Sequence, residues 1–97
     1  MAIAPIPMSD LQARFEQAAT RAKSLPGPPG NDTLLRLYAL YKQGSQGDAR
    51  GPRPGFFDFV DTAKREAWAK LAGTPREEAM RRYIALVAEL LDSTDTA

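Results

Sequence analysis

Residues 74–91 read TPREEAMRRYIALVAELL and carry the clearest helical signal in the chain. Thr74 suits the N-cap position, Pro75 suits the first helical position, and Glu77 completes a capping box. The apolar residues that follow recur every three or four positions and so share one helical face; they are Ala79, Met80, Tyr83, Ile84, Val87, Leu90 and Leu91. The sequence therefore predicts a helix with a sustained apolar stripe.

Three more helical segments precede this one, separated by clusters of proline and glycine at residues 26–30 and 44–55. The first starts at Ser9, where Gln12 completes a capping box. Its apolar face consists of Leu11, Phe15, Ala18, Ala19, Ala22 and Leu25. The second follows the cap cluster at residues 31–33 and runs to about Gly44. The third begins near residues 58–61 and stops at Gly73, a natural residue to follow a helix.

These segments predict an all-α fold, and the short joints between most of them favour a four-helix bundle. A chain of 97 residues makes one domain. We expect the bundle to span residues 9–91. Residues 1–8 are predicted to be disordered or loosely packed, and residues 92–97 form a polar tail.

Composition excludes several classes of protein. The chain has no cysteine and no histidine, so disulfides, thiolate metal sites and the commonest general base are missing. A net charge of +1 gives no global attraction to nucleic acid. Pro5 and Pro7 interrupt the N-terminal apolar stretch, and no apolar run approaches the ~20 residues that span a bilayer. We expect a cytoplasmic monomer without a metal, a cofactor or stable membrane insertion.

Two lysines are predicted to lie inside apolar helix faces. In the segment after residue 31 the apolar arc is roughly 160° wide, where a bundle helix needs little more than ~100°. That arc contains Leu34, Leu35, Leu37, Tyr38 and Tyr41, and Ala39 extends it. Lys42 falls between Tyr38 and Leu35. Lys64 falls inside the arc of Val60, Ala67, Trp68 and Leu71, while Lys23 lies beside Ala19.

Two interpretations of these lysines stay open. Each lysine could lay its methylene stem over the core with its ammonium group in water. Alternatively, a buried ammonium group needs an anion or several hydrogen bonds. Asp48, Asp58 and Asp61 are the internal candidates for that anion, and a phosphorylated ligand is the external one.

Several motifs together resemble the acyl-CoA-binding protein family over about residues 9–91. They are Tyr38-x-x-Tyr41-Lys42-Gln43, Gly47-Asp48, Arg53-Pro54-Gly55, Asp58-Phe59, Ala63-Lys64, Ala67-Trp68 and Ala79-Met80-x-x-Tyr83. The resemblance implies an up-down-down-up bundle. It also implies non-catalytic binding of medium- to long-chain acyl-CoA thioesters by an intracellular carrier.

The resemblance further implies a role for each site residue. Tyr38, Lys42 and Lys64 would hold the ribose 3′-phosphate, and Tyr41 would pack against the adenine with Lys23 nearby. Tyr83 would contribute to the phosphate-side contacts and the groove wall. The acyl path would be lined by Ala19, Leu34 and Leu35. The chain departs from the family at Val60 and Thr62, where lysines are frequent, and at Arg65, where a second tryptophan is frequent.

The same residues allow three other classes of function to be compared with acyl-CoA binding. For a thioesterase, this composition cannot supply a Ser-His or Cys-His pair, and catalysis by carboxylates alone is the form of enzyme that stays open. A helical bundle that binds protein or nucleic acid is suggested by the many arginines, although glutamates interleave with most of them. A free fatty-acid carrier without coenzyme A specificity is the closest alternative. Burying a palmitoyl chain contributes on the order of 10 kcal/mol gross, so hydrocarbon dominates affinity in either carrier.

Overall fold

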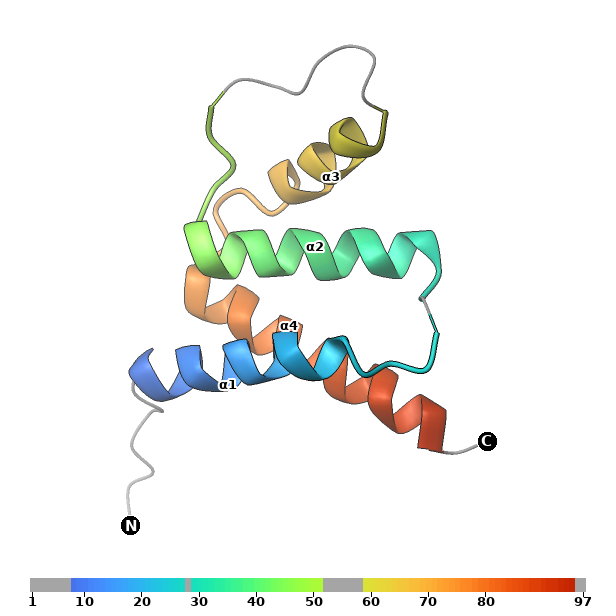
Figure 1. Cartoon of the computed structure of the whole chain (residues 1–97). Helices are drawn as coiled ribbons and strands as arrows, with labels where there is room; N and C mark the ends of the chain where they lie inside the picture. Colours follow the sequence, from blue (N-terminus) through green and yellow to red (C-terminus); the bar gives the residue numbers. More distant parts are fainter. Residues whose placement is uncertain (1–7, 28, 52–58, 96–97) are drawn as a thin grey trace.

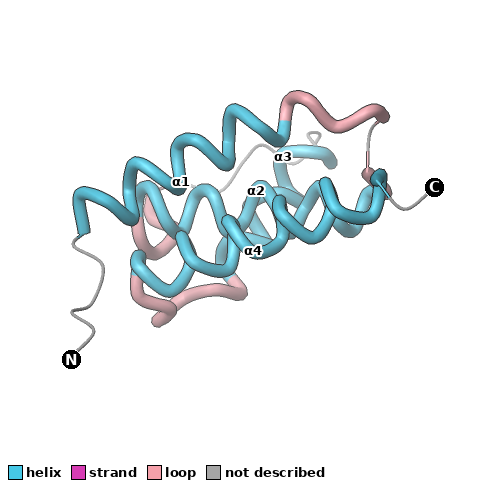
Figure 2. The backbone as a smooth tube through the Cα atoms, turned by 90° about the horizontal axis from the view of Figure 1, so that it is seen from below, coloured by secondary structure: helices cyan, strands magenta, loops and turns pink. Residues whose placement is uncertain are grey.

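The computed structural model describes residues 8–27, 29–51 and 59–95, and within them the regular structure is entirely helical (Figure 2). The helices are α1 (Met8–Ala22), α2 (Asn31–Gln46), α3 (Phe59–Ala69) and α4 (Arg76–Asp95). Figure 1 shows α1 and α4 running in one direction while α2 and α3 run in the other. The predicted all-α, up-down-down-up bundle is confirmed.

Most of the core comes from α1, α2 and α4. The helix α2 packs against both α4 and α3, and α1 packs on α4. The buried apolar cluster consists of Leu11, Phe15, Ala18, Leu37, Leu40, Ala79, Met80, Tyr83, Leu86 and Val87. Because α2 contacts helices on two sides, Leu40 is buried although it lies opposite the predicted arc. The same two-sided packing leaves Leu34 and Tyr41 exposed.

The first two helices differ from the prediction at their ends. The helix α1 begins at Met8 and ends at Ala22, so Leu25 lies in the following turn and outside the helix. Gly30 takes the N-cap position of α2, where no side-chain cap bond forms. The predicted cap residues 31–33 are instead the first turn of that helix, which continues past Gly44 to Gln46.

The junction between α3 and α4 also differs from the prediction. The helix α3 ends at Ala69 rather than at Gly73, and residues 70–73 form a turn. Gly73 has a φ of 88°, a conformation that glycine adopts without steric cost. The carbonyl of Pro75 accepts the first helical hydrogen bond of α4, from the Ala79 N–H. Pro75 is therefore the cap residue, and α4 extends to Asp95, past the start of the predicted polar tail.

A polar network joins the end of α2 to this junction. The side chain of Gln43 is fully buried, and its Nε2 donates to Asp48 Oδ1 and to the Thr74 carbonyl, both at 2.8 Å. The Gly73 N–H donates to the same Asp48 oxygen at 3.0 Å. Arg76 Nε donates to the Gly44 carbonyl at 3.0 Å. These bonds fix the C-terminal end of α2 relative to α3 and α4.

Candidate ligand-binding site

Three tyrosines line a cavity of about 440 Å³ between α1, α2 and α4. Its lining comprises Glu16, Ala19, Thr20, Lys23, Leu37, Tyr38, Tyr41 and Tyr83. Five of the predicted site residues are therefore brought together here, namely Ala19, Lys23, Tyr38, Tyr41 and Tyr83. A cavity of this size falls in the range of small-molecule sites.

Two tyrosines of this tyrosine cavity, Tyr41 and Tyr83, form a cluster of three rings with buried Phe15. Phe15 stacks on Tyr41 at 5.2 Å and meets the edge of Tyr83 at the same centroid distance. Tyr83 is only 5% exposed, and its burial, together with nearby Tyr41, raises the pKa of its phenol. Tyr83 therefore keeps its proton near neutral pH and remains a hydrogen-bond donor. Tyr41 is 41% exposed, so part of its ring stays open to a ligand.

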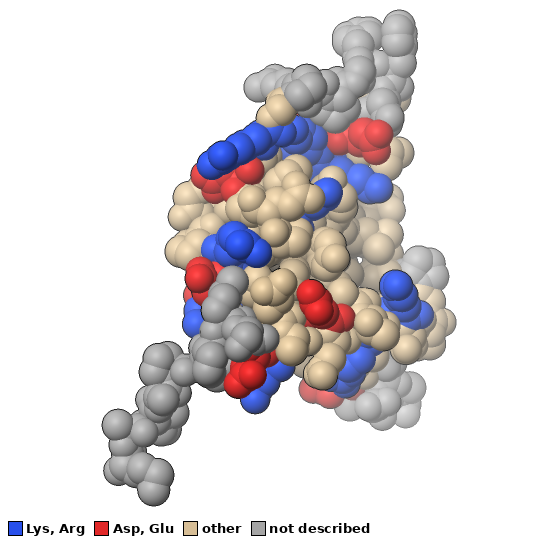
Figure 3. Space-filling view, turned by 60° about the vertical axis from the view of Figure 1, so that its left-hand side comes forward, with Lys and Arg blue, Asp and Glu red and all other residues tan. Residues whose placement is uncertain are grey.

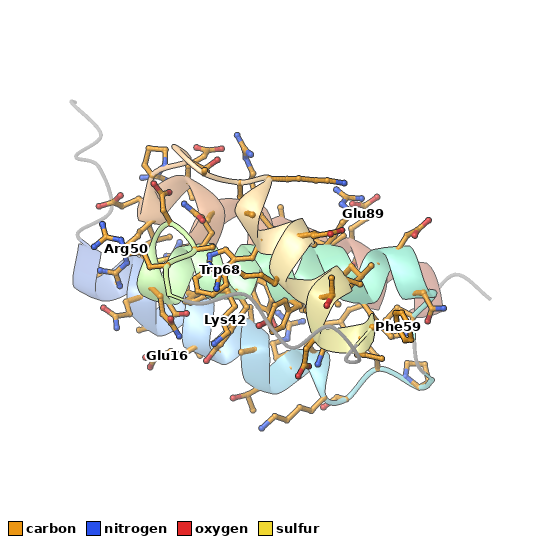
Figure 4. All side chains as sticks on the ribbon, turned by 90° about the horizontal axis from the view of Figure 1, so that it is seen from above. Glu16, Lys42, Arg50, Phe59, Trp68 and Glu89 are labelled. Atoms are coloured by element: carbon orange, nitrogen blue, oxygen red, sulfur yellow. The ribbon has the colours of Figure 1, made fainter. Side chains whose placement is uncertain are left out.

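Cations and aromatic rings alternate along the interface of α2 and α3. Lys64 Nζ lies 5.3 Å from the centroid of Tyr38, and Lys42 Nζ lies 5.9 Å from that centroid. Lys42 Nζ also lies 5.5 Å from the Trp68 ring, and Arg65 Cζ lies 5.8 Å from it. We call the series Lys64, Tyr38, Lys42, Trp68 and Arg65 the cation–aromatic row. Figure 4 shows Lys42 and Trp68 next to one another in this interface.

The row and the cavity share Tyr38, which lines the cavity and faces both lysines. Each cation–aromatic contact stabilises the folded state by about 0.5–2 kcal/mol, depending on how dry it is. Rings do not neutralise charge, however, so cations gathered around two rings attract an anion. Lys42 and Lys64, both half-buried, are thus held beside the tyrosine cavity.

One internal carboxylate that we considered for the lysines has other partners. Asp48 accepts hydrogen bonds from Gln43 and from the Gly73 N–H, which lower the pKa of its carboxyl group together with nearby Arg50. It therefore belongs to the network at the end of α2. Asp61 lies exposed in the first turn of α3, and Asp58 lies outside the described residues.

The three residues predicted for the acyl path do not share one cavity. Leu35 lines a second cavity of about 600 Å³ between α2, α3 and α4, which the tyrosines do not reach. Leu34 is 43% exposed and lines neither cavity, whereas Ala19 lines the tyrosine cavity. Leu34 and Leu35 are successive residues on a helix, so their side chains diverge by about 100°.

The three residues that depart from the family pattern all lie on α3. Val60 is 65% exposed at the start of α3, and Thr62 is half-buried two residues further on. Arg65 lies at the end of the cation–aromatic row, beside the Trp68 ring. The predicted Arg53-Pro54-Gly55 element lies outside the described residues.

The surface charges, the potential metal ligands and the length of the apolar helices were compared with the requirements of other kinds of site. On the face seen in Figure 3, basic and acidic side chains are interspersed among residues that carry no charge. Within the described residues, no group of three or more potential ligands could hold a metal ion. Over the same residues, no helix combines the length and the apolar character that crossing a bilayer requires.

A family model described as "Acyl CoA binding protein" matches residues 12–87. The chain belongs to the acyl-CoA-binding protein family. It is 47% identical to the acyl-CoA-binding protein of Saccharomyces cerevisiae over 77 residues, which cover 79% of this chain and 88% of that protein. The crystal structure of Oryza sativa acyl-CoA-binding protein 2 superimposes with a TM-score of 0.85 at 41% identity, covering 90% and 97% of the two chains. The resemblance seen in the sequence is confirmed.

Some relatives in this family are longer proteins. The chain is 44% identical to enoyl-CoA delta isomerase 2 of Rattus norvegicus over 90 residues. The match covers 93% of this chain but only 23% of the isomerase. The chain therefore spans less than a quarter of the length of that relative.

The structure places further residues beside the candidate site that the sequence did not indicate. Trp68 was placed on the apolar arc of its helix but not in the site, although its position four residues after Lys64 puts both on one face. Arg65 was noted only as a departure. Glu16 and Thr20 gave no signal, because they fall on the polar side of the apolar stripe of α1.

Proposed function

We propose that this chain binds medium- to long-chain acyl-CoA thioesters and acts as an intracellular carrier of them. The observation that carries the proposal is the junction at Tyr38, where a tyrosine-lined cavity meets two half-buried lysines. Membership of the acyl-CoA-binding protein family supports it.

The polar end of the ligand would be held at this junction. Tyr38, Lys42 and Lys64 would hold the 3′-phosphate through charge-assisted hydrogen bonds, each contributing about 1.5–3 kcal/mol where partly desolvated. Tyr41 presents an open ring face on which an adenine could stack. Lys23 and Tyr83 stand on the wall of the same cavity.

The acyl chain would supply most of the affinity. Each buried methylene contributes about 0.8 kcal/mol, less the cost of ordering the chain and the groove. The residues proposed to contact the acyl chain are exposed Leu34, Leu35 in the lining of the second cavity, and Ala19 in the lining of the tyrosine cavity. The polar contacts then distinguish coenzyme A thioesters from free fatty acids.

We propose that the chain itself is not catalytic and works as a cytoplasmic monomer. The absence of histidine and cysteine from the whole sequence supports the first part, since no Ser-His or Cys-His pair can be assembled. Release of free thiol from palmitoyl-CoA would contradict it. Sedimentation at the mass of a dimer, with or without ligand, would contradict the monomer.

One calorimetric comparison tests the function. Palmitoyl-CoA, coenzyme A and palmitate are titrated separately into the protein under one buffer condition. Palmitoyl-CoA should bind more tightly than either part alone. If palmitate binds as tightly and coenzyme A does not compete, the chain is a free fatty-acid carrier instead. If none of the three binds, a protein-interaction bundle becomes the better interpretation.

A further inference from the structure

Arg65 connects the base of the α2–α3 loop to the cation–aromatic row. Its Nη1 donates to the Arg50 carbonyl at 2.9 Å, and its Nη2 donates to the Gly51 carbonyl at 3.0 Å. The same guanidinium group lies 5.8 Å from the Trp68 ring. One side chain thus contacts two successive loop carbonyls and one aromatic ring.

Trp68 is in turn fixed from two further directions. Its Nε1 donates to the Gly47 carbonyl at 2.8 Å, and the ammonium group of Lys42 lies 5.5 Å from its ring. Trp68 is 7% exposed, so its ring has little freedom to turn. Arg65, Trp68 and Lys42 therefore form a chain of contacts from the loop to the lysine that faces Tyr38.

We infer that Arg65 is a positioning residue for recognition of the coenzyme's 3′-phosphate, acting through Trp68 on Lys42; this rests on the proposed function. We assign Arg65 a positioning role because two of its five N–H donors bond the loop carbonyls and its guanidinium group lies beside Trp68, outside the lining of the tyrosine cavity. Its planar fork holds the loop and the indole in one fixed arrangement, which keeps the Lys42 ammonium group between the Tyr38 and Trp68 rings.

The chemistry of arginine explains why another cation would not serve equally. A guanidinium group presents paired donors in a rigid plane, so it can bond two adjacent carbonyls and still stack on a ring. A lysine at this position keeps the charge but has a single nitrogen on a flexible stem. Arg65→Lys therefore removes the planar fork and keeps the charge, whereas Arg65→Gln removes both.

The experiment measures affinity for coenzyme A and for 3′-dephospho-coenzyme A by calorimetry. The ratio of the two affinities reports recognition of the 3′-phosphate alone. The ratio should fall on the order of threefold to tenfold in Arg65→Gln, with a smaller loss in Arg65→Lys. Binding of the dephospho ligand should stay within about twofold. Arg36→Gln, which removes an arginine beside the second cavity, should leave the ratio unchanged.

Fluorescence supplies a second readout, because Trp68 is the only tryptophan in the chain. Its emission in the ligand-free protein should shift in Arg65→Gln and less in Arg65→Lys. All titrations are run well below the melting temperature of each variant. If Arg65→Gln does not fold, the affinity ratio and the emission shift are measured in Arg65→Lys alone, and an unchanged ratio there overturns the inference.

The outcomes separate this inference from the proposed function. An unchanged ratio in a folded Arg65→Gln variant would overturn the inference while leaving acyl-CoA binding intact. A normal ratio in Arg65→Lys beside a reduced one in Arg65→Gln would also overturn it, because charge alone would then suffice. If the wild-type protein binds no coenzyme A derivative, it is the proposed function that fails.

Discussion

Replacing Lys42 by methionine should remove one phosphate contact while leaving the hydrocarbon site unchanged. Its ammonium group lies 5.9 Å and 5.5 Å from the centroids of the Tyr38 and Trp68 rings. Methionine preserves the length of the stem and offers a sulfur that packs well against aromatic rings. The two lost cation–aromatic contacts should therefore lower the free energy of unfolding by only about 1 kcal/mol.

The effect on ligand affinity should be larger than the effect on stability. A charge-assisted hydrogen bond to phosphate is worth about 1.5–3 kcal/mol, and the lower half of that range applies because Lys42 is only half-buried. An affinity loss of about 2 kcal/mol corresponds to roughly thirtyfold in Kd. The same factor should apply to short and long acyl chains, because the lost contact involves the coenzyme and not the hydrocarbon.

Calorimetry across a series of acyl-CoA lengths measures both the loss of affinity and its dependence on the length of the acyl chain. The plot of binding free energy against chain length should shift by a constant while keeping its slope. Arg14→Met is the matched control, since Arg14 is exposed on α1 and lines neither cavity, and it should leave the plot in place. An unchanged Kd in Lys42→Met would refute the phosphate contact. A changed slope would show that Lys42 belongs to the hydrocarbon site.

Three further predictions concern packing, charge and pH. Gly44→Ala should lower the free energy of unfolding by about 1–3 kcal/mol in chemical denaturation, because the new Cβ would lie 3.0 Å from a buried ring carbon of α1; Gly27→Ala, with nothing within 4 Å, should be close to neutral. Glu16→Gln should strengthen coenzyme A binding, most clearly at low salt, since this carboxylate lines the cavity proposed for an anionic ligand; equal affinity at low salt would contradict that placement. The hydrogen bonds that lower the pKa of Asp48 stabilise the fold above its ordinary value of 3.8, and this contribution is lost as the pH falls through the lower folded value. Melting temperatures at about pH 2.5 and about pH 7 should therefore differ less for Asp48→Asn than for the wild type.

The fold was predictable because local signals and packing agree along most of the chain. The apolar stripe of α4 and the Gly73-Thr74-Pro75 junction each have a strong local cause, so the helices were found with ends in error by a few residues. The burial of Leu40 was not predictable from one helix alone. It depends on α2 lying between α3 and α4, and a helical wheel contains no information about neighbours.

The binding site was predicted unevenly for a similar reason. Placing Lys42 and Lys64 inside apolar arcs required only helical periodicity, and the structure puts both ammonium groups over one tyrosine ring. The contacts of Arg65 with Arg50 and Gly51 join a helix to the end of a loop, and no periodic pattern encodes them. The grouping of Leu34 with Leu35 came from the family resemblance, and the structure separates them by the turn of the helix.

The exposed part of the arc of α2 links folding to function. A face that served only the core would bury its leucines and tyrosines, yet Leu34 and Tyr41 are each more than two-fifths exposed. Exposed apolar surface contributes nothing to the stability of the free protein, but it is surface that a hydrocarbon ligand would bury. Lys42 of α2 and Lys64 of α3 follow the same logic, since an aromatic ring attracts an ammonium group without neutralising its charge. A ligand that carries both hydrocarbon and phosphate would therefore bury the exposed apolar residues of α2 and bring an anion to the two lysines that face Tyr38.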